Sequence, residues 1–239
     1  MTATGSRASE MAAAGPTAMR IRKVGQAASA IVMILVFLLM SRYLYFAVLQ
    51  YTNVTEASYT AHFFNQIPWF VPHILGGFVA FVVGPLQFVP FIRRRYRALH
   101  RAMGKVYVGA IVVGGVTSLC LLPAVVGGIG MQGGLGGFGI AWLLTTGLAV
   151  RAIMNRQWQL HGRWMFRSYV LTLSFSIIRI GNEALAKFGM DSADDRGLLM
   201  IWAGWLVPLA AAEIALRLFF PLRSRKAPMV RGVGGAVTA

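Results

Sequence analysis

The sequence is poor in acidic residues and in cysteine. It contains 7 Asp and Glu against 23 Lys and Arg among 239 residues. Its lone cysteine, Cys120, can form no intrachain disulfide, so cysteine usage says nothing about the redox compartment. The sequence also offers no zinc motif, no nucleophile–base arrangement and no pair of carboxylates suited to hydrolysis. It therefore assigns no catalytic residue and no metal site, and it leaves open whether the protein is an enzyme.

Charged residues of both signs make up only 13% of the chain, whereas hydrophobic residues make up 57% and the mean hydropathy is +0.64. A soluble domain of this size does not need so much apolar surface, so we expect lipid to be the main solvent. A helix crosses the hydrocarbon core with about 20 mostly apolar residues. Six runs are of about this length, at approximately 24–50, 69–92, 106–126, 135–153, 166–182 and 198–220.

These runs predict an all-α, polytopic membrane bundle of about six transmembrane helices. Backbone groups in lipid need internal partners, and the alternating pattern of barrel strands is absent. We expect one membrane domain over 24–222, between a disordered tail at 1–23 and a basic, flexible tail at 223–239.

The cations are concentrated in alternate links between the runs. A net charge of +16 would suggest nucleic acid in a soluble protein, but here position matters more than the sum. Lys and Arg gather before the first run, at 93–105, at 151–167 and after 222, whereas 127–134 is uncharged and 183–197 is net acidic. The positive-inside rule therefore predicts that both termini are cytoplasmic. Basic loops also attract anionic lipids, so we expect the bilayer and its anionic lipids as partners and no nucleic acid.

A short stretch occurs twice. "LHRAMGKVYV" at 99–108 returns as "LHGRWMFRSYV" at 160–170, one residue out of register, and duplication remains an open alternative. Both copies are predicted at the cytoplasmic entrance of a helix, where unpaired N–H groups and the helix dipole favour an anion. The predicted cofactor-binding residues of this inner cluster are His100, His161, Gln87, Lys105 and Arg167.

The inner cluster suits several ligands. A lipid phosphate, a quinone carbonyl or the propionates of a haem would each fit a cationic helix entrance with a histidine. Two imidazoles on facing helices hold b-type haem in helical bundles, so His100 and His161 suggest that cofactor. The alternative is that each histidine only anchors its helix at headgroup level, beside Tyr107 and Tyr169.

Ionisable residues at membrane depth are costly and therefore suggest function. At 1.5 Å per residue His73 and Arg179 share a level in the outer half, and Glu183 follows Arg179 by four residues on the same helix face. We predict an outer polar cluster of His73, Arg179 and Glu183. Glu213 should lie about 12 Å deeper than Arg179 and pair instead with Arg217, four residues on.

Several motifs together resemble a family of predicted bacterial multi-pass membrane proteins, a domain of unknown function. They are "HILGG" at 73, "GPLQF" at 84, "LHRAMGKVYV" at 99, "HGRWMFRSY" at 161, Arg179 and Glu213, and the resemblance covers about 69–217. It implies a multi-pass fold in a bacterial cytoplasmic (inner) membrane and a grouping of His73, Gln87, His100, His161, Arg179 and Glu213. Leu209 stands where this family often has asparagine.

Two functional hypotheses follow. The first is an inner-leaflet cofactor or lipid site at His100 and His161, with b-haem or quinone redox chemistry as the cofactor-dependent form. The second is a noncatalytic accessory or lipid-binding subunit of a membrane complex, in which the clusters are structural. A transporter ranks third because no acidic residue lies at the membrane midplane to couple an ion.

Overall fold

The computed structural model describes Leu38 and residues 65–219. The described residues from Gln66 onward belong to one compact unit, which is separate from the unit that ends at Asn65. Apart from Leu38, the predicted run at 24–50 lies outside the described residues, as do the tails at 1–23 and 223–239.

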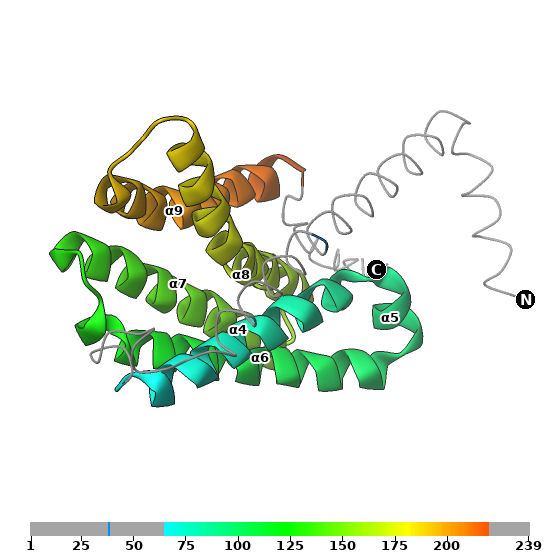
Figure 1. Cartoon of the computed structure of the whole chain (residues 1–239). Coiled ribbons are helices and arrows are strands. Elements are labelled where there is room, and N and C mark those ends of the chain that lie inside the picture. Colours follow the sequence, from blue (N-terminus) through cyan, green and yellow to red (C-terminus); the bar gives the residue numbers. More distant parts are fainter. Residues whose placement is uncertain (1–37, 39–64, 220–239) are drawn as a thin grey trace, which may run out of the picture. The chain divides into compact units, whose positions relative to one another are not determined.

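Every regular element between residues 65 and 219 is helical, which confirms the all-α prediction for this part of the chain. The elements are α4 (Ile67–Phe88), α5 (Pro90–Arg95), α6 (Arg97–Cys120), the 3-10 turn η1 (Leu122–Ala124), α7 (Gly128–Met154), α8 (Trp158–Lys187) and α9 (Ala193–Phe219) (Figure 1). Several helices begin well before the predicted apolar runs. Hydropathy marks the part that suits hydrocarbon, whereas a helix continues into the headgroup region.

Four of the described helices are long and apolar enough to cross a membrane. They are α4, α6, α7 and α9, with the span in α9 ending at Leu218. The predicted run at 166–182 also lies in a long helix, α8, but α8 is too polar to count with these four. Four of its hydroxyl side chains are buried, those of Ser168, Thr172, Ser174 and Ser176.

Helices α4 and α6 pack closely because a glycine lies between them. A Cβ on Gly76 would come within 2.6 Å of the Ala110 carbonyl oxygen and 2.8 Å of the Gly114 nitrogen. Small residues allow this close approach of backbones in membrane helices. Helix α8 in turn packs on α9, α7 and α4, so it connects the α4–α6 pair to the rest of the unit.

Hydroxyl groups join α6, α7 and α8 in the core. The Tyr107 hydroxyl lies 3.0 Å from Ser168 Oγ and 3.2 Å from Thr172 Oγ1. From α7, Trp142 Nε1 donates to Thr172 Oγ1 at 2.9 Å, and Thr146 Oγ1 lies 2.7 Å from Ser168 Oγ. The polar face of α8 therefore has its partners inside the protein, as a helix in lipid requires.

Replacing Gly76 with alanine should weaken the α4–α6 contact. Overpacking of this kind typically costs about 1–3 kcal/mol, which a thermal unfolding experiment in detergent would detect as a lower melting temperature. Gly77→Ala is the matched control because a Cβ there meets nothing within 4 Å. The control should be neutral or slightly stabilising, since alanine has the higher helix propensity. Equal losses in both variants would contradict the assigned contact.

Candidate functional site

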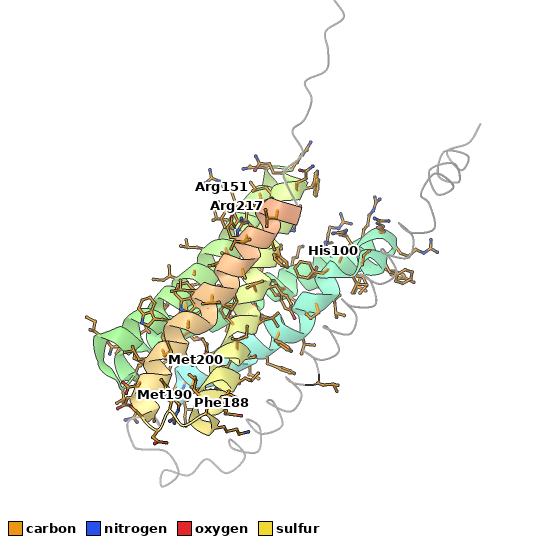
Figure 2. All side chains as sticks on the ribbon, turned by 90° about the horizontal axis from the view of Figure 1, so that it is seen from above. His100, Arg151, Phe188, Met190, Met200 and Arg217 are labelled. Atoms are coloured by element: carbon orange, nitrogen blue, oxygen red, sulfur yellow. The ribbon has the colours of Figure 1, made fainter. Side chains whose placement is uncertain are left out.

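Most of the described cations gather at one end of this unit, which we call the basic end. It consists of α5, the first turns of α6 and α8, and the last turns of α7 and α9, as the labels of His100, Arg151 and Arg217 in Figure 2 indicate. The cations here are Arg93, Arg94, Arg95, Arg97, Arg101, Lys105, Arg151, Arg156, Arg163, Arg167 and Arg217. The link between α8 and α9, near the labels of Phe188 and Met190, lies at the opposite end. One aspartate lies in this link and two more lie in the first turn of α9.

The two histidines of the repeated stretch occupy equivalent positions at the basic end. His100 is the fourth residue of α6 and His161 is the fourth residue of α8. Each donates its main-chain N–H to the N-cap carbonyl, Tyr96 or Gln157, at 2.9 Å. The repeat therefore places both imidazoles at the same end of the bundle.

The two imidazole rings have different surroundings. The Nδ1 of His161 lies 2.9 Å from the Ala149 carbonyl oxygen, which can only accept, so Nδ1 is the donor. A neutral His161 ring then leaves Nε2 unprotonated, the state in which a histidine ligates metal. The Nδ1 of His100 is buried and has no hydrogen-bond partner. Among the residues that the structure describes, no three His, Cys, Asp or Glu side chains group as metal ligands.

Gln87 and Tyr169 are two further buried polar residues, on α4 and α8. Their exposed fractions are 6% and 7%, and neither Gln87 Nε2 nor the Tyr169 hydroxyl has a hydrogen-bond partner. Gln87 was predicted as a site residue, whereas Tyr169 was not. The repeated Tyr-Val pair was the available signal. The alternative in which each histidine only anchors its helix expected Tyr107 and Tyr169 beside it at headgroup level, whereas both tyrosines lie in the core.

Arg167 and Glu213 form an ion pair between α8 and α9. Arg167 Nη2 lies 2.5 Å from Glu213 Oε2, and Arg217 Nε lies 2.8 Å from Glu213 Oε1. The second contact confirms the predicted pairing of Glu213 with Arg217. The first was not predicted, since it joins residues far apart in the sequence. Arg163 adds a hydrogen bond from Nη1 to the Leu216 carbonyl at 3.1 Å, so two arginines tie α8 to the end of α9.

The two cations of the predicted inner cluster have different surroundings. Arg167 is bound to Glu213 and its guanidinium also lies 4.5 Å from the centre of the Trp164 ring. Lys105 is exposed on α6. The cations of α5 and α6 are exposed, and the buried atoms His100 Nδ1 and Gln87 Nε2 have no hydrogen-bond partner.

His73 and Arg179, predicted to share a level, both contact Phe175. The His73 ring meets the Phe175 ring edge-on at 6.2 Å, and the Arg179 guanidinium lies 5.1 Å from that ring's centre. His73 Nδ1 also donates to the Gly114 carbonyl at 2.8 Å, which links α4 to α6. Glu183 lies one turn beyond Arg179 and is exposed.

The membrane helices and their buried polar groups define a multi-pass membrane protein. A family model described as "Predicted membrane protein (DUF2306)" matches residues 70–216, and the chain belongs to this family of unknown function. The match confirms the resemblance identified from the motifs. No curated protein and no solved structure matches the chain.

Loss of Arg167 should destabilise the protein more than loss of Arg217. Both bind the Glu213 carboxylate, but the Arg167 side chain is 12% exposed and the Arg217 side chain is 74% exposed. A hydrogen bond to a charged group contributes about 1.5–3 kcal/mol, whereas an exposed ion pair contributes about 0–1 kcal/mol. Thermal unfolding of Arg167→Gln and Arg217→Gln in detergent compares the two. Similar losses would show that burial does not strengthen the Arg167 contact.

Proposed function

We propose that the protein is a multi-pass protein of the bacterial cytoplasmic membrane whose basic end faces the cytoplasm, with both chain termini on that side. The segregation of the described cations supports this orientation, because cytoplasmic segments are enriched in Lys and Arg. The aspartates of the α8–α9 link and of the first turn of α9 would then face outward. In this orientation His100 and His161 lie at the level of the inner leaflet.

The proposed activity is binding of an anionic amphiphile at the basic end. The observation that supports it is the uncapped entrance of α6 and α8. Neither N-cap residue makes a side-chain hydrogen bond to its helix, and neither first turn contains an acidic residue. Unpaired N–H groups, the helix dipole and neighbouring cations such as Arg101 and Lys105 together favour a phosphate group. An anionic phospholipid of the inner leaflet supplies that group.

Binding of b-type haem is the second candidate function. The hydrogen bond from His161 Nδ1 to the Ala149 carbonyl favours it, because it orients the ring and leaves Nε2 available to iron. The protein would supply the oriented His161 ring and His100 to hold the haem. The absorption spectrum of the preparation used for lipid analysis distinguishes the two functions, since a reducible Soret band absent from His161→Ala would favour haem.

Reporter fusions test the orientation. A reporter that is active only in the cytoplasm should work when fused in the α7–α8 link, residues 155–157, and should fail in the α8–α9 link, residues 188–192. Alkaline phosphatase, which is active only outside the cytoplasm, should give the reciprocal pattern. The reverse result with both reporters would place the basic end outside and remove the proposed function.

Lipid analysis tests the binding site. Arg101→Gln combined with Lys105→Gln should weaken binding of phosphatidylglycerol about tenfold or more, because each charge-assisted bond contributes about 1.5–3 kcal/mol. Native mass spectrometry of the detergent-purified protein measures the bound lipid. Arg94→Gln with Arg95→Gln removes the same charge from α5 and should have the smaller effect. If both pairs lose lipid equally, the cations act only as a diffuse positive surface.

A further inference from the structure

Three buried polar atoms in the region between α4, α6 and α8 have no hydrogen-bond partner. They are Gln87 Nε2 on α4, His100 Nδ1 on α6 and the Tyr169 hydroxyl on α8. A fourth such atom, Trp205 Nε1, belongs to α9, where its ring stacks on Phe138. Buried polar groups nearly always have partners, so three exceptions in one region need an explanation.

The three residues converge on the same part of the bundle. The Gln87 Oε1 lies 3.5 Å from the position that a Cβ on Gly104 would occupy, so the side chain extends toward α6. The Tyr169 ring lies so close to α4 that a Cβ on Gly84 would come within 2.4 Å of it. Gly84 and Gln87 are three residues apart on α4, and His100 precedes Gly104 by one turn of α6.

The direction of the side chains brings Gln87 and Tyr169 toward one level. Side chains in a helix lean toward its N-terminus. Tyr169 therefore leans toward the basic end, where α8 begins, and Gln87 leans away from it, because α4 runs in the opposite direction. No hydrogen bond joins the two residues. The direction of the two side chains thus brings their donors toward one level between α4 and α8.

A comparison with Tyr107 shows that the protein core can provide hydrogen-bond partners for a buried tyrosine hydroxyl. Tyr107 and Tyr169 both lie against Gly84, yet the Tyr107 hydroxyl has Ser168 and Thr172 as partners. The Tyr169 hydroxyl has none. Since an unpartnered buried hydroxyl reduces stability, its retention is explained if a ligand completes the site.

The chemistry of the donors selects an uncharged acceptor. An amide N–H₂ and a phenol O–H are neutral, and the Phe88 ring lies 5.6 Å from the Tyr169 ring. A phosphate or carboxylate at this level would need a cation, but Lys105 is exposed and Arg167 is bound to Glu213. A carbonyl oxygen on a flat ring fits both the donors and the aromatic wall.

We propose that Gln87, Tyr169 and His100 bind the head ring of an isoprenoid quinone. Gln87 Nε2 and the Tyr169 hydroxyl donate to one carbonyl oxygen. His100 lies four residues from Gly104, about 6 Å along α6 and closer to the basic end, where the second carbonyl of the ring would come. The isoprenoid tail extends into the bilayer. This site goes beyond the proposed lipid binding, because its donors are buried and uncharged.

Titration with decylubiquinone tests the proposal. Quinones quench tryptophan fluorescence, so the full-length protein in detergent reports binding directly. Tyr169→Phe removes only the hydroxyl and should raise the dissociation constant about fivefold, the effect of one neutral hydrogen bond. Gln87→Leu should act in the same direction. The control is Tyr96→Phe, which removes an exposed hydroxyl at the basic end and should leave binding unchanged.

Thermal unfolding without quinone separates a binding role from a structural one. Tyr169→Phe should keep or raise the melting temperature, because it deletes an unpartnered polar group, whereas Tyr107→Phe deletes two hydrogen bonds and should lower it. A fall with Tyr169→Phe as large as that with Tyr107→Phe would overturn the proposal. So would unchanged quinone affinity in Tyr169→Phe.

Competition identifies the source of the carbonyl. The carbonyl could instead come from a lipid ester group. In that case phosphatidylcholine should displace decylubiquinone from the protein and should bind the Tyr169→Phe variant more weakly. This result would contradict the assignment to quinone. The double variant of Arg101 and Lys105 should leave quinone affinity within about twofold, since these side chains are exposed and serve the anionic lipid. A failure to bind quinone therefore leaves the proposed lipid binding intact. A failure to bind anionic lipid likewise leaves the proposed quinone site intact.

Discussion

A helix in lipid must find partners for its polar groups inside the protein, and α8 is where this constraint acts most strongly. Its serines and threonines would be costly against hydrocarbon. In the described unit they meet Tyr107 from α6 and Trp142 and Thr146 from α7. Those hydroxyl contacts fix how α6, α7 and α8 are aligned against one another. The apolar faces of α4, α6, α7 and α9 are left to face lipid.

The same hydroxyl contacts explain why the region around Tyr169 differs from its pseudo-equivalent around Tyr107. Ser168 and Thr172 lie on the side of α8 that faces Tyr107, so they cannot also serve Tyr169. The amide nitrogen of Gln87, on α4, has no hydrogen-bond partner either. The polar groups around Tyr107 therefore have their hydrogen-bond partners within the protein. Those of Gln87 and Tyr169 are left for a ligand. The exposed cations of α5 and α6 do not belong to either of these polar sets.

Hydropathy predicted the helical class and the approximate positions of the described helices, because the length of an apolar run is a property of the sequence alone. The rotation of each helix about its axis depends on its neighbours, so the sequence alone does not give it. The sequence predicted the depth of Tyr107 and Tyr169 along their helices. It did not predict whether each ring faces lipid headgroups or the protein core. The four-residue rule found the Glu213–Arg217 pair, whereas the Arg167–Glu213 pair depends on which faces of α8 and α9 meet.

Two histidines in this protein use one nitrogen in the same way. His73 Nδ1 donates to the Gly114 carbonyl and His161 Nδ1 to the Ala149 carbonyl, so each ring bonds to the backbone of a neighbouring helix. The amide nitrogen of asparagine occupies nearly the same place as Nδ1, whereas that of glutamine is closer to Nε2. Asparagine at either position would thus keep the link between helices and remove the second nitrogen. Sequence variation at residues 73 and 161 consequently carries chemical information: relatives with asparagine there need the link, and relatives restricted to histidine also need Nε2.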